Sequence, residues 1–231
     1  MKVLMVLTYY YPHWTGLTAY AQRLAEGLVE RGHQVTVLTS RYHNDMAAEE
    51  MHNGVRIVRI PSLLRLSRGR VMPNFPFAFN RLIREHDVVQ AHIPMLETWL
   101  VGALAHRVGR KMVMTNHGDL VMPDGLFNQI VQKIVGFMLD RGAASADVIT
   151  THSRDYAEHS AFMRPYLHKV AAICPTIESE RPDAQAVAAW RRELGLEGRP
   201  IVGFAGRFVE EKGFDYLLKA IPHVIERIPH V

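Results

Sequence analysis

The sequence predicts an α/β fold in which a parallel β-sheet is covered by helices on both faces. Short, β-rich apolar runs alternate with amphipathic stretches along most of the 231 residues. The first run, the first amphipathic stretch and the second run form a βαβ unit within 39 residues. Such alternation is typical of a parallel sheet with right-handed crossovers, in which ligands bind at the carboxyl ends of the strands.

The first βαβ unit shows why each element is expected. Residues 2–8 are a short apolar run typical of a buried strand. In residues 18–31 the apolar side chains recur at helical spacing, and Gly32 ends the pattern. Residues 34–39 are again β-rich. The same reasoning predicts strands at residues 55–60, 87–91, 111–115, 147–151 and 169–173, and helices at residues 96–108, 126–142 and 154–163.

A change of composition near Pro175 predicts a domain boundary. A polar linker follows, with a short helix capped by Asp183. One βα unit comes next, a strand at residues 200–206 and a helix at residues 213–227, and it has no sheet of its own to join. The predicted parts are a first domain, a linker with a short helix, and the start of an incomplete second domain, at residues 1–174, 175–198 and 199–231.

The composition indicates a globular protein with a core. Hydrophobic residues make up 48% of the chain and charged residues 22%, which excludes disorder as the main state. No apolar run approaches the ~18–20 residues of a membrane span, and the first run is too short for a signal peptide. A single cysteine, Cys174, excludes an internal disulfide framework and is typical of a reducing cytoplasm, so we expect a cytoplasmic protein.

The net charge of +4 has a local origin. Between Asn53 and Arg84 there are seven arginines and no acidic residue, with several leucines and phenylalanines among them. This arginine-rich segment (residues 56–84) favours contact with an anionic membrane surface or a phosphorylated acceptor. The alternative is a solvated loop whose apolar residues close over the core. Nucleic-acid binding is not expected, because the rest of the chain carries a net charge of −3.

Polar residues that could bind a ligand follow the predicted strands. Gly16 ends the loop after the first strand, where a helix N-terminus favours an anion and glycine permits close approach. Asn116 and His117 follow the strand at residues 111–115, and His92 follows the strand at residues 87–91. A histidine there can donate to a sugar hydroxyl or a phosphate oxygen. An ordinary βα turn and a loop histidine without a role are the alternatives.

A third loop carries two cations close to a predicted helix N-terminus. The helix dipole favours anions at this end, so it does not explain two cations there. Arg207 and Lys212 instead suit the binding of a polyanion such as a diphosphate. The alternative is a pair of surface salt bridges with Glu210 and Glu211.

Several other kinds of site are not supported. The sequence lacks the H-E-x-x-H and C-x-x-C patterns of metal sites and the G-x-S-x-G nucleophile elbow. The dinucleotide fingerprint G-x-G-x-x-G is also missing, which disfavours a nucleotide-dependent oxidoreductase. We therefore expect neither a metal ion nor a cofactor.

Five motifs follow one another along the chain. They are the loop at residues 9–16, the stretch at residues 24–37, Asp87-Val88-Val89-Gln90-Ala91-His92, Thr115-Asn116-His117-Gly118, and Gly206-Arg207 with Glu211-Lys212-Gly213. In their order and spacing, the chain resembles the N-terminal portion of a family 4 retaining glycosyltransferase (glycosyl transferases group 1) with the GT-B fold. The resemblance covers essentially all 231 residues.

The resemblance implies two Rossmann-like domains that face a cleft, with the acceptor mainly on the first and a nucleotide-sugar donor mainly on the second. Gly16 would then approach the donor phosphates or sugar, and His117 would contact the transferred sugar as the catalytic residue. His92 and Asn116 would be substrate-binding. Arg207 and Lys212 would neutralise the donor diphosphate in place of a metal ion.

The sequence also departs from the family pattern. Thr15 precedes Gly16 where the family often has a second glycine, and Pro175-Thr176-Ile177 stands where it often has Pro-Asn-Gly. The later glutamate pair of the family's donor site lies beyond Val231. We therefore expect a chain that is inactive without the missing C-terminal half.

Two functions follow from the sequence. The first is sugar transfer with retention to a lipid-linked or saccharide acceptor, by a cytoplasmic protein that contacts the inner face of the membrane through residues 56–84. The second is a non-catalytic module that binds an acceptor or a partner.

Overall fold

The computed structural model describes residues 1–66, 69–120, 125–175, 182–206 and 208–231. The chain divides into two compact units, Met1–Thr176 and Ile177–Val231. Each unit is described by itself.

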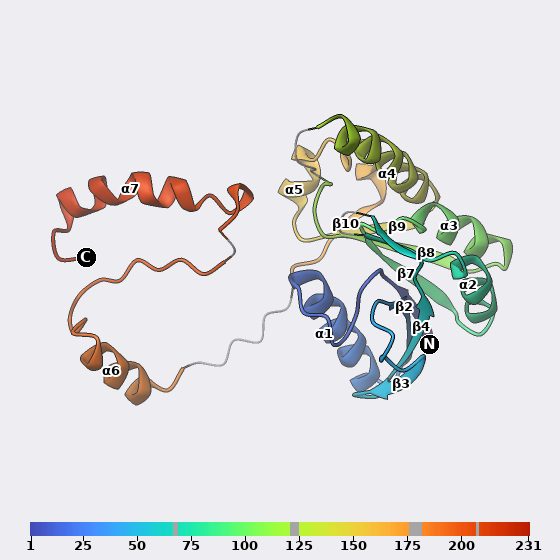
Figure 1. Ribbon diagram of the computed structural model, residues 1–231, viewed down its shortest axis with the longest axis horizontal. Helices are drawn as coiled ribbons and strands as arrows, with labels where there is room; N and C mark the ends of the chain where they lie inside the picture. Colours follow the sequence, from blue (N-terminus) through green and yellow to red (C-terminus); the bar gives the residue numbers. More distant parts are fainter. Residues whose placement is uncertain (67–68, 121–124, 176–181, 207) are drawn as a thin grey trace. The chain divides into compact units, whose positions relative to one another are not determined.

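An eight-stranded sheet forms the centre of the first unit (Figure 1). Its strand order is β10-β9-β8-β7-β1-β2-β4-β3, and every neighbouring pair is parallel except β4 and β3. A separate two-stranded sheet pairs β5 with β6. The strands are β1 (Lys2–Val6), β2 (Gln34–Arg41), β3 (Glu49–His52), β4 (Val55–Pro61), β5 (Leu64–Leu66), β6 (Gly69–Val71), β7 (Val88–Ile93), β8 (Lys111–Asn116), β9 (Val148–Thr151) and β10 (Val170–Ala172).

Helices cover both faces of the large sheet (Figure 1). The side chains of β1 alternate between two apolar clusters, as the period of a strand requires. Met5 packs in the cluster that contains Ala25 of α1, whereas Leu4 packs in the cluster that contains Phe79 of α2 and Val101 of α3. The helical segments are α1 (Gly16–Glu30), α2 (Phe75–Ile83), α3 (Thr98–Arg107), α4 (Leu126–Ser145), α5 (Arg154–His159) and the 3₁₀ helix η1 (Arg164–Lys169).

The predicted α/β fold is confirmed, with a mixed, mainly parallel sheet between two helical layers. The largest difference lies in the arginine-rich segment. The alternative predicted for it is wrong about the loop, since the segment forms strands and a helix, but right that apolar residues close over the core. All of β4 except Val55, the antiparallel strands β5 and β6, and α2 lie in this segment. Phe75 and Phe79 of α2 are fully buried and stacked, with ring centroids 5.4 Å apart, so these apolar residues do close over the core.

The second unit contains helices without a sheet. Residues 200–206 are irregular, so the strand predicted there does not form. The physical reason is the lack of a partner strand, because the described residues of this unit form no strand and a strand depends on its ladder. The helical segments are α6 (Ala184–Glu193), η2 (Glu210–Lys212) and α7 (Phe214–Arg227).

The N-cap predicted for the short helix is confirmed, since the Asp183 side chain accepts from the backbone N–H groups of Gln185 and Ala186. No residue of α6 or α7 is buried. The predicted boundaries at residues 174 and 198 stay a prediction about the domains of the protein.

Candidate functional site

Three neighbouring strands carry a histidine at the carboxyl edge of the sheet. His92 lies in β7, and His117 and His152 directly follow β8 and β9. The parallel register pairs His92 with Thr115 and Thr115 with Thr150. His117 and His152 lie two residues beyond those threonines, so the three histidines belong to one face of the sheet. The edge therefore gathers three imidazoles where ligands of such sheets bind.

His92 and His117 are in direct contact. The Nδ1 atom of His92 lies 2.9 Å from the Nε2 atom of His117, and the rings are stacked with centroids 5.2 Å apart. His92 is fully buried, whereas His117 is only half-buried. Burial, together with His117, holds the pKa of His92 well below its usual range. Burial, together with His152, lowers the pKa of His117 to about 4, so both rings are neutral at pH 7.

Tyr20 of α1 packs its ring against this cluster. Its ring centroid lies 5.0 Å from that of His117, 5.9 Å from that of His152 and 6.1 Å from that of His92, in edge-to-face arrangements. The sequence analysis missed both Tyr20 and His152. The rule that selected His117 would have found His152, because it also follows a predicted strand directly, but nothing in the pattern of α1 marks Tyr20.

The turn after β8 is fixed by hydrogen bonds around Asn116. Asn116 is fully buried and its Oδ1 atom accepts from the Gly118 backbone N–H, at 3.3 Å. Gly118 has φ +151°, a conformation that favours glycine. Asp119 accepts from the hydroxyl groups of Tyr156 and Ser160 at 2.6–2.8 Å. Burial and Asp119 raise the pKa of Tyr156 to about 12, so its hydroxyl stays protonated. Asn116 therefore shapes the turn that presents His117.

Gly16 is the first residue of α1. Thr15 is the N-cap and forms a capping box with Thr18, whose hydroxyl accepts from the Thr15 backbone N–H at 2.7 Å. A Cβ atom added at Gly16 would meet open space, so neighbouring atoms do not require glycine there. Thr15, which departs from the family pattern, thus has a structural role, and Gly16 leaves the helix N-terminus open to a ligand.

The predicted cations belong to the second unit. Lys212 is exposed at the end of η2, before Gly213, which has φ +63°. Arg207 lies outside the described residues, as does the Thr176-Ile177 pair on which the family's Pro-Asn-Gly motif would align. The structure therefore brings Gly16, His92, Asn116 and His117 into one unit, whereas Lys212 belongs to the other.

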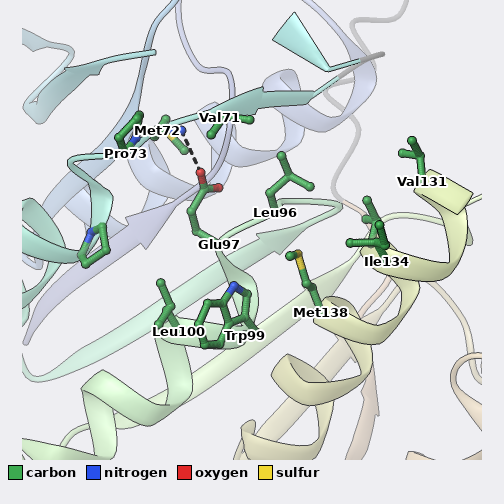
Figure 2. A pocket seen from close by; sticks show the side chains of 12 residues that line it. Val71, Met72, Pro73, Leu96, Glu97, Trp99, Leu100, Val131, Ile134 and Met138 are labelled. Carbon is green, nitrogen blue, oxygen red and sulfur yellow. Dashed lines mark hydrogen bonds between the residues drawn. The ribbon is translucent and has the colours of Figure 1, made fainter. Parts of the chain in front are cut away.

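An apolar cavity of about 350 Å³ lies among α3, α4 and the end of β6. Figure 2 shows Glu97 among its apolar neighbours, with its carboxyl group directed at Met72. The Met72 backbone N–H donates to Glu97 Oε1 at 3.0 Å, and Glu97 Oε2 is buried without a partner among the described residues. Burial raises the pKa of Glu97. The cavity is lined by Val71, Met72, Pro73, Pro76, Leu96, Glu97, Trp99, Leu100, Val131, Ile134, Val135 and Met138.

In the arginine-rich segment, some arginines form ion pairs within the fold and others are exposed. Arg59 is buried and pairs with Glu50 at 2.5 Å, and Arg56 pairs with Glu49 at 3.0 Å. Arg81 of α2 and Arg84, the residue that follows this helix, are exposed, and Phe77 of the same helix is 79% exposed. Arg68 and the side chain of Arg65 lie outside the described residues.

The part of the chain that the structure describes offers no cluster of three or more His, Cys, Asp or Glu side chains suited to a metal ion. Within the same residues, no helix is long and apolar enough to span a bilayer.

Comparison with known proteins identifies the family. The model of the glycosyl transferase 4-like domain matches residues 15–176, which include Gly16, His92, Asn116 and His117. The chain belongs to this family of glycosyltransferases. It is 30% identical to a GDP-mannose-dependent α-(1-6)-phosphatidylinositol monomannoside mannosyltransferase of Mycolicibacterium smegmatis, over 98% of this chain and 58% of that protein. It is 22% identical to the phosphatidylinositol N-acetylglucosaminyltransferase GPI3 subunit of Saccharomyces cerevisiae, over 96% of this chain and 50% of that protein.

Solved structures support the GT-B fold of this family member. The chain superposes on sucrose-phosphate synthase from Thermosynechococcus elongatus with a TM-score of 0.63, at 16% identity, over 96% of this chain and 60% of that one. A glycosyltransferase from Rickettsia africae gives 0.59, at 13% identity, over 96% and 57%. The chain thus spans between half and three fifths of the length of these proteins.

Proposed function

We propose that this glycosyltransferase 4-like chain is the acceptor-side portion of an enzyme that transfers a sugar, with retention of configuration, from a nucleotide-sugar donor. The observation that carries the proposal is the histidine edge. His117, inside the matched family domain, is presented by a fixed turn at the carboxyl end of β8, beside the helix that begins at Gly16. On this proposal the acceptor-side domain lies within the unit Met1–Thr176, and residues 199–231 of the second unit begin the donor domain.

In the proposed mechanism His117 contacts the transferred sugar and Gly16 lies next to the donor phosphates. The backbone N–H groups of the first turn of α1 and the helix dipole favour an anion at this place. Arg207 and Lys212 stabilise the negative charge that develops on the leaving diphosphate, so no metal ion is required. Asn116 contributes by shaping the turn that carries His117.

We propose a lipid acceptor in preference to a free saccharide. The apolar cavity beside Glu97 lies on the first unit, and it can receive the apolar part of an acceptor. The exposed Phe77, Arg81 and Arg84 suit the surface of an anionic membrane, which attracts cations and accepts aromatic side chains. The names of both curated relatives describe transfer to a phosphatidylinositol lipid. On this proposal the protein lies in the cytoplasm and contacts the inner face of the membrane peripherally.

The test uses the protein encoded by its complete reading frame. It is incubated with radiolabelled GDP-mannose or UDP-N-acetylglucosamine and with vesicles that contain phosphatidylinositol. We expect a labelled lipid whose anomeric configuration, read by NMR, is that of the donor. The 231-residue chain alone serves as the comparison and is expected to be inactive.

The alternative function, a non-catalytic acceptor-binding or partner-binding module, makes a different prediction. If the reading frame ends at Val231 and neither donor hydrolysis nor transfer to lipid or saccharide is detectable, the transferase proposal is wrong and the binding module is favoured.

A further inference from the structure

His92 lies behind His117 and does not reach the surface. It is fully buried in β7, and its Nδ1 atom meets the Nε2 atom of His117 at 2.9 Å. Its other ring nitrogen, Nε2, is also buried and has no hydrogen-bond partner among the described residues. A residue in this position acts on a ligand only through His117.

The contact between the two rings requires one donor and one acceptor. Both imidazoles are neutral at pH 7, because burial lowers the pKa of each. A neutral imidazole carries one N–H and one lone pair, so the nitrogen that it uses in one bond determines what the other nitrogen can do. Two arrangements are therefore available to the pair.

In the first arrangement, His92 Nδ1–H donates to His117 Nε2. The buried Nε2 of His92 is then an unpaired acceptor, and His117 carries its proton on Nδ1. In the second arrangement, His117 Nε2–H donates to His92 Nδ1. His92 must then carry a proton on its buried Nε2, which is an unpaired donor, and His117 Nδ1 becomes an acceptor.

The first arrangement has the lower energetic cost. Among buried backbone groups, an N–H without any partner is rarer than an under-satisfied acceptor, and we extend this preference to the imidazole nitrogens. Nothing among the described residues approaches His92 Nε2 closely enough to accept from it. The pair is therefore expected to keep the proton of His92 on Nδ1.

The other ring nitrogen of His117 is open to solvent. His117 Nδ1 has no hydrogen-bond partner among the described residues and is not one of their buried unpaired atoms, so solvent reaches it. We propose that His92 is a positioning residue that fixes His117 as the Nδ1–H tautomer and so makes it a hydrogen-bond donor toward the bound ligand. The chemistry that such a donor recognises is a hydroxyl or phosphate oxygen, and only this last step rests on the proposed function.

The tautomer can be measured without activity. In the 231-residue chain with ¹⁵N-labelled histidine, long-range ¹H–¹⁵N spectra at pH 7.5 distinguish a protonated ring nitrogen from an unprotonated one. The signals of His117 are assigned by their loss in His117→Gln. We expect protonated Nδ1 and unprotonated Nε2. A wild-type spectrum with protonated Nε2 would overturn the proposal without any variant of His92.

Two variants of His92 test its role. In His92→Asn the amide nitrogen takes the place of Nδ1 and keeps a donor toward His117, so the Nδ1–H tautomer is retained. In His92→Leu the donor is lost, so His117 is expected to show a mixture of tautomers. Unchanged His117 signals in a folded His92→Leu would show that the pair does not set the tautomer.

Kinetics of the complete protein then connect the tautomer to transfer. In His92→Leu we expect kcat to fall about tenfold, which corresponds to the usual contribution of one hydrogen bond. In His92→Asn, which keeps the donor, we expect kcat to stay close to the wild-type value. A loss that His92→Asn does not rescue would indicate packing alone and contradict the positioning role. Absence of transfer in the wild-type protein would refute the proposed function and leave the tautomer result intact.

Discussion

Helices α1 and α7 both have an amphipathic sequence, but they differ in how far their apolar faces are buried. Both are amphipathic, and the separation of apolar and polar faces is the sharper one in α7. Yet α1 places Ala21 and Ala25 in a core with β1 and β2, whereas no residue of α7 is buried. The difference shows that an amphipathic pattern alone does not bury a helix, because burial depends on a sheet against which its apolar face can pack.

Truncating matched phenylalanines in the two units gives the largest expected effect. Phe79 is fully buried in the core of the first unit, and Phe208 in the second unit is 76% exposed. Phe79→Ala should lower the free energy of unfolding by about 3–5 kcal/mol, through lost burial and a cavity. Phe208→Ala should change it by less than about 0.5 kcal/mol. Urea titration followed by circular dichroism measures both, and equal effects would remove the distinction between the units.

Acidification should destabilise the first unit through its histidine cluster. The pKa of His117 is lowered to about 4 in the folded protein, against 6.5 in the unfolded chain. Between these values the unfolded chain binds the extra proton, so the free energy of unfolding is undiminished above pH 6.5 and falls as the pH drops toward 4. The loss is about 1.4 kcal/mol per pH unit, or about 3 kcal/mol in total for His117.

The comparison of two histidine variants checks this prediction. Urea unfolding at pH 7.0 and pH 4.5 should show a smaller pH difference in His117→Asn than in the wild-type chain. His223 in α7 is exposed, so His223→Asn should leave the difference unchanged. If the difference in unfolding free energy between the two pH values were the same in His117→Asn as in the wild-type chain, groups other than His117 would be responsible for it.

A pair of aspartates should give the smallest effect. Asp147 joins β8 to β9 by accepting from the Met112 backbone N–H, Lys111 and His106 at 2.8–2.9 Å, whereas Asp215 in α7 has a surface pair with Lys219 at 3.3 Å. Asp147→Ala should lower the free energy of unfolding by about 1–3 kcal/mol, and Asp215→Ala should lower it by at most about 0.5 kcal/mol. Thermal unfolding of the two variants measures the difference, and a larger loss in Asp215→Ala would contradict the account.

The sequence predicted the parts of the fold whose pattern is local and strong. Most strands of the large sheet are short β-rich runs, and the rule that ligands bind at their carboxyl ends selected His92, Asn116 and His117 in advance. α2 was missed because its buried Phe75 and Phe79 lie on either side of Pro76, in a stretch rich in arginine. The strand predicted at residues 200–206 does not form. Here the local composition is that of a strand, but no partner strand is present among the described residues of the second unit to pair with it.

The interior of the site could not be predicted in the same way. His92 and His117 are 25 residues apart, and their contact depends on the register of β7 against β8. Tyr20 reaches the cluster from α1 because that helix packs over the same face, which its own sequence does not reveal. Long-range register and helix placement are properties of the folded sheet, and single-residue patterns carry no direct signal of either.

The central claim is that His117 contacts the sugar in transfer. The most direct measurement compares kcat/KM of the complete protein with those of His117→Ala and of His159→Ala, whose side chain is 79% exposed on α5. We predict a loss of about 100-fold or more in His117→Ala, with the fold retained, and wild-type activity in His159→Ala. Wild-type activity in a folded His117→Ala would contradict the claim.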